Sequence, residues 1–189
     1  MKILGGTYRG MNFFMPKDIR PTQNLVRKAL FDILGQELDG EKVLELFAGS
    51  GALGLEALSR GAGNVTFVER ESHHVEVILE NIKRLKIEEA HPQNKSKVQV
   101  LTQDAFASIK LFAKNEEKFD LVIADPPYEE ELGKKALKHL GAYDILHPNS
   151  VVVIQHYKRQ ILPQQEGRIM LFREESYGAT RLSFYKIIS

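Results

Sequence analysis

Two short segments of this sequence carry residue types suited to bind a ligand at the end of a β-strand. In the first, Gly49, Gly51 and Gly54 follow an apolar run and satisfy the pattern G-x-G-x-x-G. Glycine lets the backbone approach a ligand at a place where a β-carbon would block the contact. The pattern alone is compatible with a dinucleotide, so an NAD-linked oxidoreductase is one interpretation.

The second segment is Asp125-Pro126-Pro127-Tyr128, which directly follows another apolar run. Two consecutive prolines make a rigid turn without an N–H donor at either position, so carbonyl and carboxylate oxygens can converge there as acceptors. The exocyclic amine of a nucleobase needs such acceptors for its hydrogens, and its base needs an aromatic ring for stacking. The segment therefore predicts a site for a base amine. The structural alternative is a tight turn capped by Asp125.

The glycine segment and two acidic residues follow three successive predicted strands, so they should lie at one edge of a sheet. Glu69 ends the second of these strands, and Asp104 follows the third. A carboxylate at the position of Glu69 can accept hydrogen bonds from both hydroxyls of a ribose, which NAD and S-adenosylmethionine both contain. Asp104 and the N–H of Ala105 are placed to bind an adenine amine, although Asp104 alone is more typical of a helix N-cap.

From Glu41 onward, short β-branched runs alternate with longer helical patterns, which is typical of βα units that build a mostly parallel sheet. The predicted strands are residues 42–47, 64–68, 97–102, 119–124 and 150–156. The predicted helices are residues 52–60, 72–85, 105–115 and 129–140. Two further strand-like runs, 168–173 and 181–187, predict an antiparallel hairpin at the C-terminus. The expected fold class is therefore α/β.

The residues before Glu41 predict a different unit, a small hairpin followed by a helix over residues 22–38. Thr22 is the expected N-cap of this helix. Its expected buried face is formed by Val26, Ala29, Leu30, Ile33 and Leu34. We therefore divide the chain into a basic N-terminal extension, residues 1–40, and a body, residues 41–189.

The net charge of +1 conceals an uneven distribution of charge along the chain. Residues 1–28 carry +5, residues 29–155 carry −7 and residues 156–189 carry +3. If the two basic ends meet in space, an acidic body carries a basic face, which is the pattern expected of a protein that binds a polyanion. The plain alternative is scattered, solvated surface charge.

Composition excludes several classes of protein. The chain has no cysteine, which excludes disulfide scaffolds, iron–sulfur sites and cysteine nucleophiles. No apolar run approaches the roughly 18 residues of a membrane span, and the start of the chain has no signal-peptide core, so we expect a cytoplasmic protein without membrane contact. The six histidines show no metal-ligand spacing along the sequence, so we expect no metal site.

The glycine segment with Glu45 and Phe47, joined to Asp-Pro-Pro-Tyr after the fourth strand, resembles the class I S-adenosylmethionine-dependent methyltransferases that modify amines of nucleic acids. Two further pieces, residues 20–31 and 177–182, resemble the bacterial 16S ribosomal RNA guanine-N2 methyltransferases of the RsmD type. The resemblance covers nearly the whole chain. It implies a Rossmann-like sheet and methyl transfer from S-adenosylmethionine to the N2 amine of a guanine.

The resemblance also implies roles for individual residues. The acceptor amine would be held by Asp125, Pro126, Pro127 and Tyr128. The cofactor would be bound by Thr22, Glu45, Phe47, Ala48, Gly49, Gly51, Glu69, Arg70, Asp104, Ala105 and Asp125. Thr22 and Glu45 would lie near its methionine end, although Glu45 stands where the shorter Asp is more common.

The implied partner is 16S rRNA, within a small-subunit particle or an assembly intermediate, bound by a monomer. The cations expected to contact RNA phosphates are Lys2, Arg9, Lys17, Arg20 and Arg27. Because Lys2, Arg9 and Lys17 precede the body, removal of residues 1–17 is expected to weaken RNA binding and leave cofactor binding nearly intact.

Three alternatives remain open at this point. An NAD-linked oxidoreductase would use the glycines and Glu69 but leaves Asp-Pro-Pro-Tyr unexplained. A non-catalytic RNA-binding assembly factor could retain the same fold without activity. Among enzymes, adenine-N6 methylation, or guanine-N2 methylation of another RNA or of DNA, fits the same motif, because Asp-Pro-Pro-Tyr recognises an amine and not a particular base.

Overall fold

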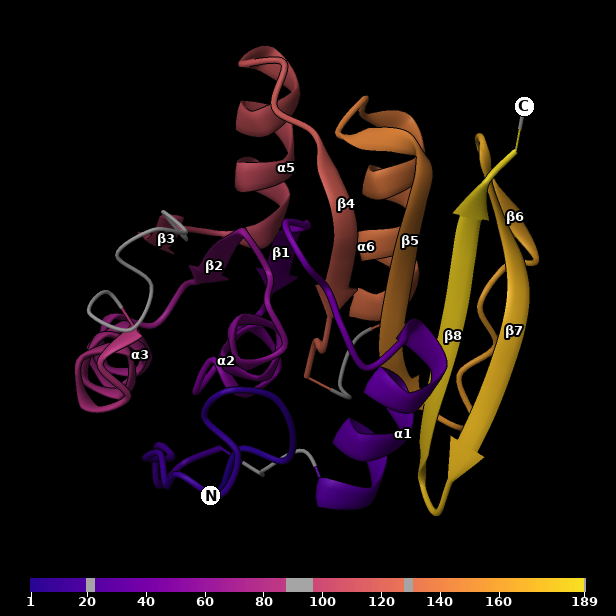
Figure 1. Ribbon diagram of the computed structural model, residues 1–189. Helices are drawn as coiled ribbons and strands as arrows, with labels where there is room; N and C mark the ends of the chain where they lie inside the picture. Colours follow the sequence, from indigo (N-terminus) through magenta and orange to yellow (C-terminus); the bar gives the residue numbers. More distant parts are fainter. Residues whose placement is uncertain (20–22, 88–96, 128–130, 189) are drawn as a thin grey trace.

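A computed structural model of the protein describes residues 1–19, 23–87, 97–127 and 131–188. Its centre is an eight-stranded sheet in the order β3-β2-β1-β4-β5-β8-β7-β6 (Figure 1). The strands are β1 (Lys42–Leu46), β2 (Asn64–Glu69), β3 (Lys97–Thr102), β4 (Phe119–Ala124), β5 (Leu146–Tyr157), β6 (Gln165–Glu166), β7 (Ile169–Tyr177) and β8 (Thr180–Ile187). The helices are α1 (Asn24–Leu34), α2 (Ala52–Ser59), α3 (Ser72–Arg84), α5 (Ala105–Lys114) and α6 (Leu132–Ala142).

The first five strands are parallel and the last three are antiparallel. β1 pairs in parallel with β2 and β4, β2 with β3, and β4 with β5. β8 then pairs antiparallel with β5 and β7, and β6 with β7. This arrangement confirms the predicted α/β fold with an antiparallel C-terminal hairpin. Because parallel strands point the same way, β1, β2, β3 and β4 all end at one side of the sheet, which we call the carboxyl edge.

The largest differences from the predicted boundaries are at α1, β5 and β7, where β7 extends to Tyr177, four residues beyond the predicted run. Strand β5 begins at Leu146, four residues before the predicted start. Pro148 and Asn149 resemble a turn in the sequence, and proline cannot donate to a strand ladder, so the first part of β5 was not predicted. The register between β4 and β5 also shifts between Phe119 and Leu121. The predicted helix start at 129 lies outside the described residues.

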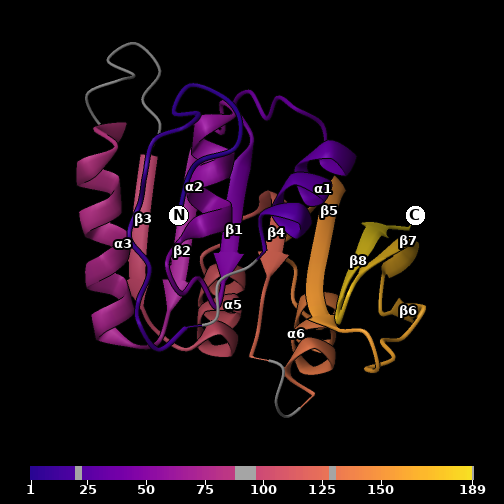
Figure 2. The ribbon, with the colours of Figure 1, turned by 90° about the horizontal axis from the view of Figure 1, so that it is seen from below.

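Two apolar layers cover the two faces of the sheet, and neighbouring strand residues alternate between them. Val43 packs into the layer that contains the apolar residues of α1, α2 and α3, whereas Leu44 packs into the layer of α5 and α6. Figure 2 shows the same division, with α1, α2 and α3 on one face and α5 and α6 on the other. Among the described helices, none combines the length and apolar character needed to span a membrane.

Helix α1 is shorter than predicted. It begins at Asn24 after Gln23 at the N-cap position, so the prediction of Thr22 as the N-cap is wrong; Thr22 itself lies outside the described residues. It ends before Gly35, whose φ of 113° lies in the region that glycine tolerates best. Its fully buried residues are Val26, Arg27, Leu30 and Phe31, whereas the predicted Ala29, Ile33 and Leu34 are only partly buried.

The first 14 residues fold back across α2 and α3 with little regular structure. The predicted hairpin is reduced to one isolated antiparallel bridge between Lys2 and Asn12. Ile3, Tyr8 and Phe13 are buried in the same apolar layer as α1 and α2. The segment therefore contributes to the core of the sheet domain, and removing residues 1–17 would expose that core rather than delete a separate RNA-binding arm.

Buried side chains of α2 hold this segment in place. The carboxylate of Glu56 accepts hydrogen bonds from the N–H groups of Leu4 (2.9 Å) and Gly5 (2.8 Å) and from the guanidinium of Arg60. A β-carbon at Gly6 would lie 1.7 Å from the carbonyl oxygen of Ser59, so only glycine fits where the segment crosses α2. These contacts fix the start of the chain. From there, residues 15–19, which we call the strap, continue toward the carboxyl edge.

Candidate active site

A cavity of about 580 Å³ lies at the carboxyl edge of the parallel strands. Eleven residues predicted from the sequence line it: Glu45, Phe47, Ala48, Gly49, Glu69, Arg70, Asp104, Ala105, Asp125, Pro126 and Pro127. They come from the ends of β1, β2, β3 and β4, whose common direction brings them together from positions up to 82 residues apart. The volume is in the range of small-molecule and cofactor sites.

The glycine segment forms a tight turn between β1 and α2. Phe47, Gly49 and Gly51 have positive φ values of 58°, 56° and 75°. For a bulky residue such as Phe47 this conformation costs on the order of 1–3 kcal/mol, and such strain is found mostly at functional sites. Gly51 does not line the cavity; its N–H donates to the carbonyl of Ala48 and closes the turn. The sequence predicted the turn, and Phe47 as a cofactor residue, but not the strained backbone of Phe47.

The third glycine of the pattern has a packing role. A β-carbon on Gly54 would lie 2.4 Å from the ring of Phe67 and 2.8 Å from Oε2 of Glu45. Gly54 therefore allows α2 to pack closely on β2, and it does not line the cavity. Close packing at this position is needed with or without a dinucleotide, so the G-x-G-x-x-G pattern does not by itself favour NAD.

Glu45 lines the cavity, but its carboxylate is already engaged by the backbone of α2. Oε1 accepts from the N–H of Leu53 (3.2 Å) and Oε2 from the N–H of Gly54 (2.9 Å), and the residue is 3% exposed. Burial raises the pKa of this carboxyl to about 8; the two N–H donors oppose the rise, and the charges of Asp125 and Glu69 add to it. Glu45 therefore fixes the turn at the cavity floor.

The raised pKa of Glu45 predicts a loss of stability between about pH 4.5 and pH 8. Over this interval the unfolded chain releases the proton that the folded protein retains, so the free energy of unfolding falls as the pH rises, by on the order of a few kcal/mol. Glu45→Gln removes this titration, and urea unfolding at pH 5 and pH 8 should show a smaller drop for the variant than for the parent. The matched control is Glu80→Gln on the exposed face of α3. If the free energy of unfolding fell equally in the parent and in Glu45→Gln, the raised pKa of Glu45 would be contradicted.

Glu69 connects the turn after β1 with the start of α3. Its Oε2 accepts from the N–H of Gly49 (2.7 Å) and its Oε1 from the N–H of Glu71 (2.9 Å). Oε1 also lies 3.5 Å from Nδ1 of His74. These bonds hold a nearly buried carboxylate at the cavity wall, where the sequence predicted a ribose-binding acid.

Asp104 is both an N-cap and a cavity residue. Its Oδ1 accepts from the N–H groups of Phe106 (2.9 Å) and Ala107 (3.0 Å), which caps α5. Both capping bonds use Oδ1, so Oδ2 takes no part in the cap. The structure therefore contains the helix cap that was the alternative interpretation of this residue, and it also places Asp104 at the cavity, where the adenine-binding role stays a prediction.

The segment after β4 reaches the cavity beside the end of β1. Asp125 is half-buried and its N–H lies 3.4 Å from the carbonyl of Leu46 on β1. Pro126 is buried, Pro127 is exposed, and both line the cavity. Tyr128 lies outside the described residues.

The sequence pattern did not predict Gln155, which lies next to Asp125. The register Ala124↔Ile154 between β4 and β5 brings the following residues, Asp125 and Gln155, side by side. Gln155 is 3% exposed and lines the cavity, as does Thr180 of β8. The feature of the sequence that could have indicated this residue is a single polar side chain directly after the apolar run 151–154.

The predicted RNA-binding cations fall into two groups. Lys2, Arg9 and Lys17 are exposed, as phosphate contacts require. The prediction that Arg27 contacts RNA is wrong, because its side chain is fully buried and donates to the carbonyl of Lys2 (2.6 Å) and to Asn24. Arg27 thus fastens the N-terminal segment to α1. Arg20, like Thr22, lies outside the described residues.

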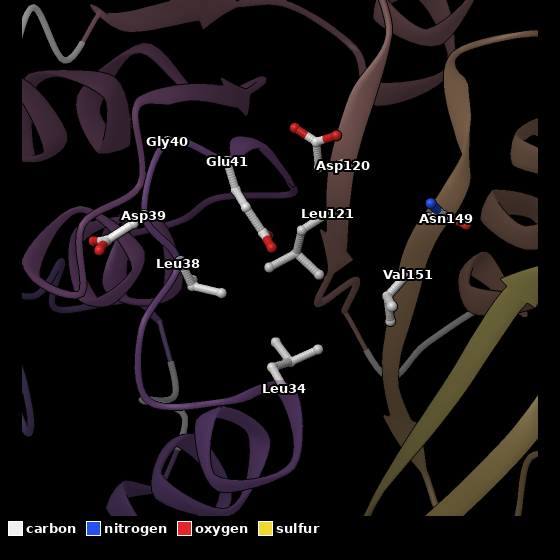
Figure 3. Close-up of a pocket in the computed structure, with 9 residues that line it drawn as sticks. All are labelled: Leu34, Leu38, Asp39, Gly40, Glu41, Asp120, Leu121, Asn149 and Val151. Atoms are coloured by element: carbon white, nitrogen blue, oxygen red, sulfur yellow. The ribbon is translucent and has the colours of Figure 1, made fainter.

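A second cavity, of about 370 Å³, lies at the opposite edge of the sheet, between the residues that precede β1 and the first half of β4 and β5. Figure 3 shows the apolar side chains of Leu34 and Leu121 facing this cavity, with Glu41 and Asp120 beside them. Burial, together with the charge of Asp120, raises the pKa of Glu41. Of the residues predicted for the cofactor or acceptor, those that the structure describes do not line this cavity.

Comparisons with known proteins agree with this fold. The family model described as conserved hypothetical protein 95 matches residues 1–186. The chain is 32% identical to YlbH of Bacillus subtilis (strain 168) over 188 residues, 98% of each protein. It is 30% identical to ribosomal RNA small subunit methyltransferase D of Haemophilus influenzae over 190 residues, 98% of this chain and 93% of that protein.

A solved structure of a hypothetical protein from Thermus thermophilus has the same fold. Its TM-score is 0.82 at 28% sequence identity, and the match covers 99% of both chains. The family model and the two relatives span almost the whole sequence, including the cavity residues at the carboxyl edge. The chain therefore belongs to the family described as conserved hypothetical protein 95, together with ribosomal RNA small subunit methyltransferase D.

Proposed function

We propose that this protein transfers a methyl group from S-adenosylmethionine to the exocyclic N2 amine of a guanine in 16S ribosomal RNA. The proposed substrate is the RNA within a small-subunit particle or an assembly intermediate, bound by a single copy of the chain. The family relation to ribosomal RNA small subunit methyltransferase D supports RNA methylation. The guanine and its N2 atom rest on the resemblance of residues 20–31 and 177–182 to the RsmD type.

The charge of the cavity is the observation that carries the choice of cofactor. Among the residues that the structure describes, six acidic ones line it: Asp18, Glu45, Glu69, Glu71, Asp104 and Asp125. The basic residues in this described part of the lining are Arg70 and His74. Even with Glu45 protonated, five carboxylates favour a ligand with positive charge, such as the sulfonium and ammonium groups of S-adenosylmethionine, and disfavour the two negative charges of the NAD pyrophosphate.

The described residues divide into two ends that fit the two reactants. Glu69 is placed for the ribose and Asp104 with Ala105 for the adenine, on the strands β2 and β3. Asp125 and Pro126 line the cavity after β4 and would bind the amine of the acceptor base. S-adenosylmethionine supplies an electrophilic methyl group on a positively charged sulfur, whose departure as a neutral thioether needs no metal.

The contribution of Asp125 and the Pro126 carbonyl is to orient a weak nucleophile. The guanine amine is a poor nucleophile because its lone pair is delocalised into the ring. Hydrogen bonds from the amine to these two acceptors would turn the lone pair toward the methyl carbon. Such positioning of two reactants can supply roughly 7–11 kcal/mol of the barrier reduction. A paired base must be exposed or flipped out to reach the cavity.

Isothermal titration calorimetry tests the cofactor assignment. We expect binding of S-adenosylmethionine and of its demethylated product, and no binding of NAD under the same conditions. Binding of NAD without binding of S-adenosylmethionine would favour the oxidoreductase alternative and refute the proposal. Cofactor binding without methyl transfer to any RNA would favour the non-catalytic assembly factor.

The exposed cations of the N-terminal segment should contribute to RNA affinity. We expect the double variant Arg9→Gln/Lys17→Gln to weaken RNA binding and to reduce the slope of log K against log salt by about 0.7–0.9 for each phosphate that is no longer neutralised. Fluorescence anisotropy with labelled rRNA between low and moderate salt measures both quantities. The matched control, Lys110→Gln/Lys114→Gln, removes two exposed cations from α5 on the other face of the sheet. An unchanged slope in the N-terminal variant would place the RNA site elsewhere, with the basic C-terminal hairpin as the next candidate.

A further inference from the structure

Three side chains with metal-binding atoms meet beside the cofactor cavity. Nε2 of His73 lies 2.9 Å from Oδ2 of Asp18, and Nε2 of His74 lies 3.2 Å from the same oxygen. All three ligand atoms lie within 4.8 Å of one another. The two histidines belong to the first turn of α3, and Asp18 belongs to the strap that leads to α1. We call this group the Asp18–His cluster.

The spacing of these atoms fits a divalent transition-metal ion. In a tetrahedral zinc site with bonds of about 2.0–2.1 Å to nitrogen and oxygen, neighbouring ligand atoms are roughly 3.3 Å apart. The two nitrogen–oxygen distances in the cluster are close to that value, so small side-chain shifts would admit an ion. Imidazole nitrogens select zinc, copper, nickel or cobalt over magnesium and calcium.

The cluster also has access to solvent and support from a further carboxylate. The side chains of His73 and Asp18 are 56% and 58% exposed, so an ion can enter and water can complete its coordination. His74 is mostly buried, and its second ring nitrogen, Nδ1, lies 3.5 Å from Oε1 of Glu69. Metal-bound histidines usually direct their second nitrogen to such an acceptor, which fixes the orientation of the ring.

We propose that Asp18, His73 and His74 bind a divalent transition-metal ion such as Zn²⁺, with water in the remaining position. The ion would join the strap to α3 at the rim of the cavity, because Met15, Asp18 and Ile19 of the strap line the cavity wall. Its role is structural: Asp18 and His74 line the cavity, but none of the three ligands is among the residues proposed to contact the ribose, the adenine or the acceptor base. The site does not depend on the proposed function.

Zinc titration of the metal-free protein tests the site directly. Protein without a polyhistidine tag is treated with chelator, dialysed, and titrated with Zn²⁺ by calorimetry in the absence of S-adenosylmethionine and RNA. We expect one ion per chain, no comparable binding of Mg²⁺, and a higher unfolding temperature with Zn²⁺. Loss of a supporting carboxylate typically weakens metal binding about 10- to 100-fold, so Asp18→Asn and His73→Gln, which remove a ligand, should weaken it at least that much.

His147→Gln is the matched control, because it removes an exposed histidine far from α3 in the sequence and should leave zinc affinity unchanged. Asp18 and His73 are exposed, and urea unfolding of the metal-free variants checks that they remain folded. Absence of zinc binding by the parent would refute the site and leave a hydrogen-bonded carboxylate and two imidazoles. Equal affinity in the parent, Asp18→Asn and His73→Gln would place any bound ion elsewhere and refute the site as well. Because the titration contains no S-adenosylmethionine or RNA, neither result bears on methyl transfer.

Discussion

Asp125→Ala should lower the rate of methyl transfer by about 100-fold or more and should lower the affinity for S-adenosylmethionine far less. The reason is positional: Asp125 follows β4, where we propose that it binds the acceptor base together with Pro126, whereas the ribose and adenine contacts are expected from β2 and β3. Misplacement of a reacting group by about 1 Å is enough to cost roughly 100-fold in rate. Single-turnover transfer to rRNA measures the rate, and calorimetry measures the affinity.

Two further variants make this result specific. Asp125→Asn keeps one acceptor oxygen and should lie between the parent and Asp125→Ala. Asp32→Ala removes an exposed carboxylate from α1, away from the cavity lining, and should transfer at the parent rate. If Asp125→Ala turned over as fast as the parent, the Asp-Pro-Pro segment would be only a structural turn.

Glu69→Ala should weaken S-adenosylmethionine binding by about 1–3 kcal/mol, which corresponds to roughly 5- to 150-fold in Kd. The variant loses the proposed ribose acceptor. It also leaves the N–H groups of Gly49 and Glu71 without the carboxylate that now accepts from them. Both losses act on the same cavity wall. The loss of free energy of cofactor binding should therefore exceed any loss of stability in parts of the sheet far from the cavity.

Glu69→Gln separates the two contributions. Its amide oxygen can replace one of the two acceptors, so its affinity should be intermediate. Glu76→Ala, an exposed residue on α3, is the matched control and should bind like the parent. Calorimetry that finds Glu69→Ala binding as tightly as Glu76→Ala would remove Glu69 from the cofactor site.

The carboxyl edge could be predicted from the sequence because its geometry follows from strand direction alone. Once the apolar runs 42–47, 64–68, 97–102 and 119–124 are assigned as parallel strands, the residues after them must share one edge. Glu69, Asp104 and Asp125 follow from this rule, and the structure places all three on one cavity. The rule predicts where a residue lies but not which groups it bonds to. The hydrogen bonds that the carboxylate of Glu45 accepts from N–H groups of α2 were therefore not predicted.

The features that the sequence did not reveal depend on contacts between distant segments. Arg27 was predicted to be a surface cation, yet it shares the buried face of α1 with Leu30 and Phe31 and donates to the first residues of the chain. In the Asp18–His cluster, Asp18 is separated from His73 by 55 positions and from His74 by 56 positions in the sequence. The spacing of the histidines alone therefore predicted no metal site, and only the folded chain brings Asp18 to them. Charge and spacing along the chain do not specify which face a side chain occupies.

Methyl transfer to ribosomal RNA is the most direct test of the central proposal. Small-subunit particles and free RNA from cells that lack the protein are incubated with it and with S-adenosylmethionine labelled in the methyl group, and the RNA is digested to nucleosides. We expect the label in N2-methylguanosine from 16S rRNA, with about one methyl group per particle at completion, and only a small fraction of that label when Asp125→Ala is used for the same time. Label in an adenine would refute the choice of base. No label in any RNA, from protein that is folded and binds S-adenosylmethionine, would contradict the proposed function itself.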